Sequence, residues 1–343
     1  DVRKEGHMKE RNKTASFAIW AGGQAARMVL LLLLVSMVSF VLLSVSPLDP
    51  LQTNVGQAAL GSMSPEQIER LRTCWGVDVP PVRRYTLWLI DLLKGDMGVS
   101  LLYRRPVTEV IAGKLSNSLG LLLTAWFFSG LAGFFLGILA GKRRGGLADR
   151  LITGYSLIAA STPAFWAAMM LLMVFSVYLK WFPIGLSVPI GASVGEVTLF
   201  DRIHHAVLPA VALSLTGISS IALHTREKMI EIMESDYVLF SRARGEGEME
   251  IVLRHGLRNI LLPAMTLQFS SASEIIGGSV LVEQVFSYPG LGQAAVTAGL
   301  GGDAPLLLGI TMITALIVFA GNLTANVLYG WIDPRIREGA LRR

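Results

Sequence analysis

Charge is scarce in this chain of 343 residues: Asp, Glu, Lys and Arg together make up 16% of it, compared with roughly 25% of an ordinary soluble domain. Hydrophobic residues make up 52%, and the mean hydropathy is +0.54. A soluble protein of this length would need a more polar surface. The composition therefore excludes an ordinary soluble protein and indicates an integral membrane protein.

Cysteine occurs once, at Cys74, so an intramolecular disulfide and a cysteine-cluster metal site are excluded. We expect Cys74 to be a small residue in a partly buried helix.

Motifs for catalysis and nucleotide binding are missing too: the sequence has no GxxxxGK(S/T) phosphate loop, no HExxH and no GxSxG. His204 and His205 are adjacent, so their side chains diverge, which favours an interfacial polar pair over a metal site. We expect no catalytic residue, no cofactor site and no metal site on this chain.

Six apolar runs are each long enough, at 1.5 Å per residue, to cross roughly 30 Å of hydrocarbon. Inside hydrocarbon every backbone amide needs an internal partner, so these runs should be helices. The first run lacks a small-x-small cleavage site at its end, and we expect it to be retained. The sequence predicts an all-α integral membrane protein with six transmembrane helices. The expected spans are residues 28–46, 115–141, 151–179, 206–223, 259–282 and 304–332.

Lys and Arg are distributed unevenly between the connecting segments, and this bias predicts the orientation. Two short outer segments, 180–205 and 283–303, contain only two of the 30 basic residues. Another eight lie in the segment 47–114, whose length weakens its influence on orientation. Both chain ends should therefore be cytoplasmic. The other 20 basic residues lie in the expected cytoplasmic segments 1–27, 142–150, 224–258 and 333–343.

The outer segment 47–114 has helix signals and should be a folded insertion between the first two spans. Ser64 and Gln67 have the spacing of a capping box, with Pro65 at the first helical position. Tyr85–Gly95 is typical of a short amphipathic helix ended by glycine. This helix could pack within the insertion, lie on the outer membrane surface, or contact whatever docks there.

Five charges and two glycines stand between two apolar runs in the segment from Asp236 to Glu248. Asp236 can cap a helix, and Gly245 permits an angle before a second helix. In that second helix Met249, Leu253 and Leu257 would form one stripe. Two short helices at an angle would make a docking surface for a soluble partner. The alternative is a membrane-surface hairpin stabilised by anionic lipid.

Only Glu274 is an ionisable residue well inside an expected span. An ion-coupled transporter usually needs more such residues, because they bind the driving ion or relay protons. Glu274 is a candidate pathway residue in contact with substrate. It could equally be a structural group bonded to a neighbouring helix.

Several motifs carry a family resemblance over most of the chain, from about residue 27 to 337. "DYVLFSRARGEGEMEIVLRHGLRNILLP" resembles the EAA loop, the cytoplasmic signature of ABC-importer permeases, in the peptide and nickel branch. The Glu-Ala-Ala positions are Leu239, Phe240 and Ser241 here, while the glycine remains as Gly245 and Arg258 replaces the proline. Five further matches follow in the family's order: "SPEQIERLRTCWGVDVP", "GDMGVSLLYRRPV", "STPAFW", "VEQVFSYPGLG" and "DPRIR".

The resemblance implies a type I ABC-importer permease, the first (B-type) of two homologous subunits, in the bacterial cytoplasmic membrane. Its implied partners are a second permease, two cytoplasmic ATPases that bind ATP and magnesium, an extracytoplasmic binding protein and membrane lipid, with no nucleic acid. The implied mechanism is alternating access. Di- and oligopeptides are the leading substrates, with nickel or a metal–chelator complex as the alternative. A stand-alone secondary transporter or channel is a more distant alternative, and a membrane scaffold or enzyme a third.

The resemblance also assigns roles to residues. We expect "YPGLG" to form a tight turn that helps to shape an outer gate, with a plain structural turn as the alternative. The expected gate residues are Glu283, Phe286, Pro289, Gly290 and Gly292. The expected ATPase-coupling residues are Asp236, Tyr237, Phe240, Arg242, Ala243, Arg244, Gly245, Glu246, Glu248 and Leu257.

Overall fold

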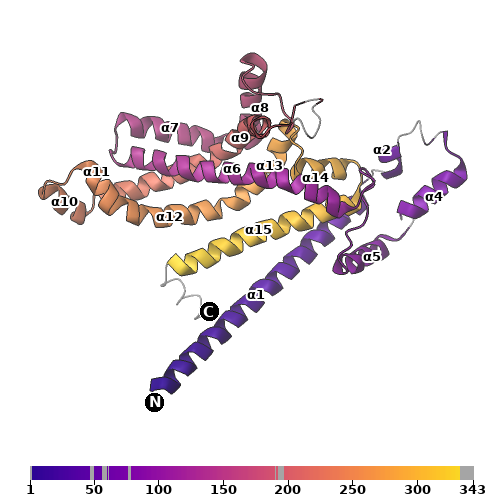
Figure 1. Cartoon of the computed structure of the whole chain (residues 1–343), viewed down its shortest axis with the longest axis horizontal. Coiled ribbons are helices and arrows are strands. Elements are labelled where there is room, and N and C mark those ends of the chain that lie inside the picture. Colours follow the sequence, from indigo (N-terminus) through magenta and orange to yellow (C-terminus); the bar gives the residue numbers. More distant parts are fainter. Residues whose placement is uncertain are drawn as a thin grey trace. The chain divides into compact units, whose positions relative to one another are not determined.

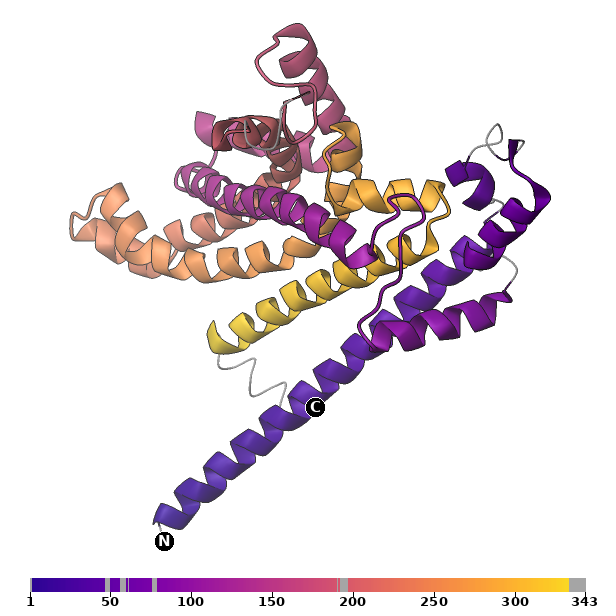
Figure 2. The same cartoon turned by 45° about the vertical axis from the view of Figure 1, so that its right-hand side comes forward.

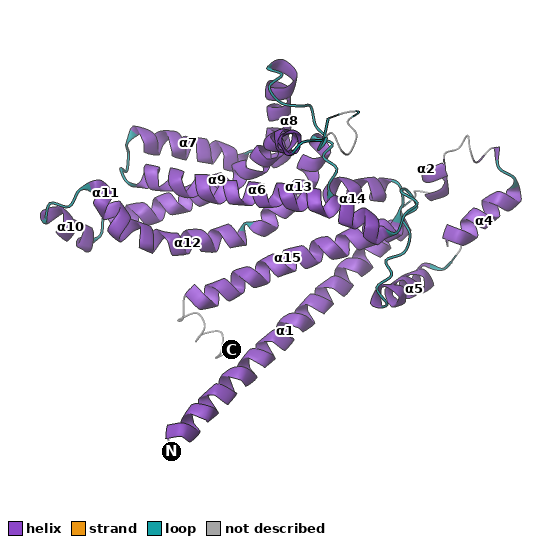
Figure 3. Ribbon diagram, viewed as in Figure 1, coloured by secondary structure: helices purple, strands orange, loops and turns teal. Residues whose placement is uncertain are grey.

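The computed structural model describes residues 2–46, 50–55, 60, 62–75, 79–189, 191 and 197–332. Among these residues every regular element is a helix, apart from an isolated antiparallel bridge between Val99 and Pro106 (Figure 3). The all-α prediction is therefore confirmed for the described part of the chain. The expected tail 333–343, with the "DPRIR" motif, and the side chain of Cys74 lie outside what is described.

In the described ranges the helices follow one another without strands between them. The bounds are α1 Val2–Val45, α2 Pro50–Val55, α4 Pro65–Trp75, α5 Pro81–Leu93, α6 Val107–Gly141, α7 Leu147–Ser161, α8 Ala164–Leu171, the π-helix η1 Leu172–Tyr178, α9 Leu199–Met233, α10 Asp236–Ala243, α11 Glu248–Ile251, the π-helix η2 Val252–Gly256, α12 Leu257–Ser270, α13 Ala272–Val285, α14 Leu291–Leu300 and α15 Ala304–Ile332.

Four helices in the described part of the chain are long and apolar enough to cross a membrane: Gly22–Val45, Val107–Gly141, Leu199–Met233 and Ala304–Ala325. A fifth span is possible if the bent pair Leu147–Ser161 and Ala164–Tyr178 counts as one. The structure thus gives four or five candidate spans where the sequence predicts six.

The expected third span, 151–179, is not straight. Helix α7 ends at Ser161, and the chain turns by 108° before α8 begins at Ala164. Pro163 explains the bend, because proline has no amide hydrogen and drives the residue before it out of the helical region. Thr162 accordingly has an extended backbone, with φ −95° and ψ 122°.

The expected fifth span, 259–282, is also divided, into α12 and α13, each of 14 residues. A helix of that length covers about 21 Å, less than the roughly 30 Å of hydrocarbon. The division lies at Ser271. There the Gln268 carbonyl accepts hydrogen bonds from Trp126 Nε1 (2.7 Å) and Ser271 Oγ (2.9 Å), so side chains satisfy it where the helix is interrupted.

The chain forms two compact units, described separately. The first comprises residues 1–111, 297–320 and 329–343. Within it α5 packs on α1 (Figure 2). The rings of Phe40 and Tyr85 lie 5.3 Å apart, and the hydroxyls of Ser36 and Tyr85 are 2.9 Å apart. Asp303 is fully buried and accepts hydrogen bonds from Ser100 Oγ (2.6 Å) and the Leu102 amide (3.0 Å). This carboxylate fixes the loop after α5 to the start of α15.

The expected helix signals of segment 47–114 are present in this first unit. The Ser64 amide donates to Gln67 Oε1 (2.9 Å), and the Gln67 amide donates to Ser64 Oγ (3.3 Å), so the capping box forms at the start of α4. Helix α5 ends before Gly95, whose φ is +88°. Helix α6 begins at Val107, within the segment expected to be outside the membrane.

The second unit comprises residues 112–296 and 321–328. Helix α9 is central to it and contacts α7, α8, α12 and α13 (Figure 1). One buried cluster lies around Leu208, Leu213, Val282 and Phe286. A second cluster lies toward the α10–α11 end and includes Met229, Val238, Ile251, Val252 and Ile260.

Candidate functional site

The polar segment found in the sequence forms a hairpin at one end of the second unit. Helix α9 continues to Met233, well past the expected end of the fourth span at residue 223. Helix α10 then begins at Asp236, with Ser235 in the N-cap position. The expectation that Asp236 caps this helix is wrong, because Asp236 lies in the first turn, where a carboxylate favours the positive end of the helix dipole.

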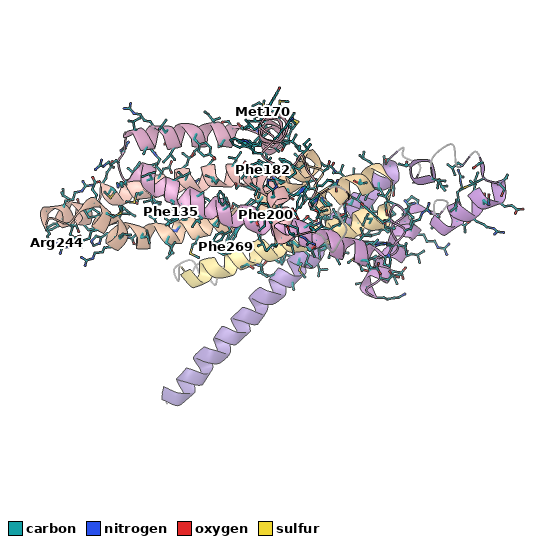
Figure 4. The ribbon with its side chains drawn as sticks, turned by 45° about the horizontal axis from the view of Figure 1, so that its top comes forward. Phe135, Met170, Phe182, Phe200, Arg244 and Phe269 are labelled. Atoms are coloured by element: carbon teal, nitrogen blue, oxygen red, sulfur yellow. The ribbon has the colours of Figure 1, made fainter. Side chains whose placement is uncertain are left out.

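Helix α10 is anchored by one face and exposed on the other. Val238 is completely buried in the cluster with Ile251 and Val252, and burying a side chain of this size contributes about 1.5–3 kcal/mol. Phe240, by contrast, is 75% exposed. Arg244 lies at the tip, far from the other labelled side chains of this unit (Figure 4). The exposed coupling residues of α10 are Asp236, Tyr237, Phe240, Arg242 and Ala243.

Gly245 ends α10 with a left-handed backbone, φ +85°. The Glu246 amide donates to the Ser241 carbonyl (3.1 Å), and the Gly245 amide donates to the Arg242 carbonyl (2.9 Å). These two bonds form a Schellman motif, in which the residue after the C-cap needs a left-handed conformation. A Cβ at Gly245 would meet no atom within 4 Å, so the turn requires glycine for its backbone angle and not for space.

Glu246 links the two arms of the hairpin. It accepts from Arg244 (2.6 Å) and lies 3.3 Å from His255 Nε2, which is itself 3.3 Å from Ser241 Oγ. Burial alone would raise the pKa of Glu246, but the hydrogen bond from His255 and the charge of Arg244 outweigh it, and the pKa is lowered. Glu246 is therefore ionised at neutral pH. His255 was missed in the sequence because it lies far from Glu246 along the chain.

The second arm differs from the short helix that the sequence predicts. Glu248 starts α11, which continues through η2 into α12. The expected stripe does not face the core: Met249 and Leu253 are exposed, and Leu257 is half-buried. The buried side chains of this arm are Ile251, Val252 and Ile260.

The expected outer-gate residues form a second site around a fully buried carboxylate. Glu283 accepts hydrogen bonds from Ser118 Oγ (2.7 Å) and the Gln293 amide (3.0 Å). Ser118 Oγ in turn accepts from the Leu291 amide (2.7 Å). Asn117 Nδ2 donates to the Pro289 carbonyl (3.0 Å). Three hydrogen bonds thus hold residues 289–293 against α6 and α13, and the Ser118–Glu283 bond joins these two helices directly.

Gly290 and Gly292 of the expected tight turn do not supply a left-handed backbone. Neither Gly290 nor Gly292 has a positive φ; the left-handed residue is Ser287, with φ 47°. A Cβ at Gly290 would overlap Ser118 Oγ and the Glu283 carboxylate, and one at Gly292 would lie 2.6 Å from the Val280 Cα. The glycines are needed for close approach. Phe286, expected at the gate, is a buried core residue whose carbonyl accepts from the Leu186 amide (2.9 Å).

Glu274 is separate from both sites. It lies exposed in the first turn of α13 and makes no ion pair with any described residue. Next to it, Ser273 Oγ donates to Asn322 Oδ1 (2.9 Å).

His204 and His205 diverge as expected and contact the carbonyls of Trp181 (3.0 Å) and Gly185 (2.8 Å). In the described part of the chain, no three His, Cys, Asp or Glu side chains group together in a way that could hold a metal.

Comparison with known proteins places this chain in a family. Residues 133–338 match the family described as binding-protein-dependent transport system inner membrane component, and residues 23–121 match its N-terminal part. The chain is 36% identical over 307 residues to the oligopeptide transport system permease protein AppB of Bacillus subtilis, covering 89% of this chain and 95% of AppB. It is 30% identical over 322 residues to the dipeptide transport system permease protein DppB of Escherichia coli, covering 89% and 94%.

A solved structure is similar in fold. The MetNI methionine ABC transporter, in an inward-facing conformation, matches with a TM-score of 0.53 and 17% identity, covering 66% of this chain and 97% of the other. The family model and the two relatives confirm the resemblance found in the sequence motifs and the expectation of a transport subunit without an ATPase domain. The chain belongs to the family of inner-membrane permeases of binding-protein-dependent ABC transport systems.

Proposed function

We propose that this chain is one of two homologous permease subunits of an ATP-driven importer of di- and oligopeptides. The observation that supports the proposal most is the α10 hairpin. It is anchored by the buried Val238, stiffened by the Gly245 turn, and exposes Phe240 and a charged edge. Such a surface fits a cleft on a soluble motor.

The coupling role follows from what force transmission requires. A segment that receives force from a soluble ATPase must lie outside the bilayer, keep its shape and present side chains to its partner. Arg242, Arg244 and Glu248 can orient the contact by complementary charge, while the apolar side chains supply contact area. ATP and magnesium belong to the two partner ATPases.

The peptide substrate is supported by the two relatives, which are named for oligopeptide and dipeptide transport. Nickel or a metal–chelator complex is the second candidate. An extracytoplasmic binding protein delivers the substrate, and the segment 47–114 helps to receive it. Alternating access then moves it, as ATP-driven closure of the ATPases rocks the two permeases.

The proposed orientation has both chain ends in the cytoplasm of a bacterium, with membrane lipid around the spans. Twenty of the 30 basic residues fall in the segments that would then be cytoplasmic. The six-span arrangement counts the bent pair α7 and α8 as one span and α12 with α13 as another. The outer loop at 283–303 shapes the outer gate, and Glu274 lines the pathway.

The proposed function is tested by uptake into proteoliposomes. We expect labelled dipeptide to enter only when the chain is assembled with its permease and ATPase partners. ATP must be present on the side of the membrane where the ATPases lie, and loaded binding protein on the opposite side. The stand-alone alternative predicts uptake by the lone chain that stops when an ion gradient is collapsed. A binding protein that purifies with bound nickel or a metal chelate would replace the peptide assignment.

A further inference from the structure

Helices α6 and α9 are in unusually close contact within the second unit. Gly133, Gly137 and Gly141 lie on one face of α6, at successive turns. A Cβ at Gly137 would lie 2.5 Å from the Thr225 Cβ, and one at Gly141 would lie 2.5 Å from the Met229 Cβ. The two backbones therefore approach as closely as glycine allows, which leaves little freedom for one helix to slide along the other.

The connection after α6 is fixed to α9 by a buried ion pair. Asp149, near the start of α7, has a side chain that is only 5% exposed. Both of its carboxylate oxygens bond to Arg226 of α9, one to Nε and the other to Nη2 at 2.9 Å. The Gly145 amide (2.7 Å) and Thr153 Oγ1 (3.1 Å) also donate to this carboxylate. Bidentate geometry with further donors is what a buried pair needs to be stable.

The same short connection reaches both ends of the coupling hairpin. Arg144 Nη1 lies 3.0 Å from Glu234, directly before the hairpin. Arg143 Nη2 lies 3.1 Å from Glu248, the last residue of the hairpin. Exposed pairs such as these contribute little stability, about 0–1 kcal/mol each. They instead fix the position of the hairpin, because Arg143 and Arg144 belong to a loop that Asp149 already holds in place.

We propose that residues 142–149 form a brace that makes the α10 hairpin, α6, α7 and α9 move as one rigid body during transport. Asp149 and Arg226 are its positioning residues. Without the brace, the described contacts that join the hairpin to the helices would be its two chain connections, the cluster around Val238 and the contact of Glu246 with His255. A push on α10 could then bend the chain at Ser235 instead of moving the spans. The proposal rests on the coupling role proposed above.

The first test replaces Asp149 by Asn in the assembled importer. Asn keeps the shape but removes the charge that faces Arg226. We expect Asp149→Asn to assemble and to hydrolyse ATP at the parent's basal rate, while stimulation by loaded binding protein falls at least fivefold. Glu231→Gln is the matched control, since it neutralises an exposed pair with Lys228 inside one helix and should leave stimulation unchanged.

The outcomes separate three explanations. If loaded binding protein does not stimulate ATP hydrolysis by the parent importer, the proposed function itself is wrong. If it stimulates the parent and the Asp149→Asn variant equally, the brace proposal is wrong. If Asp149→Asn loses both assembly and basal ATP hydrolysis, Asp149 has a purely structural role in this assay. The crosslinking test below then decides: the proposal is overturned unless the crosslinked importer still takes up peptide.

The second test locks the brace. Cys74 is the only cysteine, so Cys74→Ala provides a cysteine-free background in which Arg143→Cys and Glu248→Cys can be joined by a bifunctional maleimide. A rigid body predicts that crosslinked importer takes up peptide at the rate of the same variant without crosslinker. The single-cysteine variants treated with the reagent are the controls. A severalfold drop on crosslinking would show that loop and hairpin separate during the cycle, and would overturn the proposal.

Discussion

At the scale of single residues, buried polar groups and glycines account for the geometry of both sites. Glu283 has no exposed surface and holds the loop after α13 through Ser118 and the Gln293 amide. A buried carboxylate is costly unless donors surround it. The loop therefore has one well-defined arrangement, which a gate must change as a unit.

Gly290→Ala should destabilise the protein. The new Cβ would overlap Ser118 Oγ and the Glu283 carboxylate, and overpacking of this kind costs typically 1–3 kcal/mol. We expect a lower midpoint of thermal unfolding and weaker stimulation of ATP hydrolysis. Gly120→Ala is the control, because a Cβ there meets nothing within 4 Å and alanine favours the helix. Equal stability of the two variants would show that the close approach at Gly290 is unimportant.

Glu274→Gln should change peptide uptake without changing thermal stability. Glu274 is exposed and makes no ion pair with any described residue, so its neutralisation should leave thermal stability within about 0.5 kcal/mol. If the carboxylate lines the pathway, uptake of peptides with a free amino group should fall relative to amino-blocked peptides. A parallel loss of both uptakes, together with lower stability, would favour the structural alternative.

At the scale of helices and loops, the sequence predicts the order of the elements and several of their ends. The capping box at Ser64 and the glycine stop after α5 depend on residues close together in the chain, so local patterns predict them. The bend at Pro163 could also have been predicted, because proline acts on its immediate neighbours.

Other features depend on contacts between distant residues and could not be predicted from local patterns. The interruption at Ser271 involves Trp126, which belongs to another helix. The ion pair of Asp149 with Arg226, and the contact of Glu246 with His255, each join residues whose proximity follows only from the fold. The stripe of Met249, Leu253 and Leu257 follows from their spacing, but spacing alone does not show whether such a stripe faces the core or the solvent; the structure leaves Met249 and Leu253 exposed.

Segment 47–114 should act in docking and not in membrane insertion. It forms its own helices, and none of the α5 side chains is buried, which leaves surface for a partner. Replacing residues 62–94 by a flexible linker of similar reach should weaken binding of the loaded binding protein at least tenfold. Membrane insertion, measured by fractionation and protease protection, should be unchanged. Full transport by this variant would refute the docking role.

At the scale of the whole molecule, we propose that a partner ATPase supplies the energy and that this chain transmits the force. The family assignment establishes an inner-membrane permease, and the hairpin at Asp236–Glu248 is the proposed point of contact with the motor. If that is correct, a change at the hairpin should separate ATP hydrolysis from transport without unfolding the helices around it.

Gly245→Trp in the assembled importer is the most direct test of this claim. A side chain at Gly245 has space in the isolated chain, but it would project from the turn toward the partner and strain a left-handed backbone, which costs an L-residue roughly 1–2 kcal/mol. Gly245→Ala, with the strain but little bulk, is the matched control. We predict that Gly245→Trp inserts normally yet binds the ATPases weakly, or hydrolyses ATP without responding to loaded binding protein, while Gly245→Ala retains most of the response. Should Gly245→Trp assemble, hydrolyse ATP and transport like the parent, the hairpin is not the coupling element.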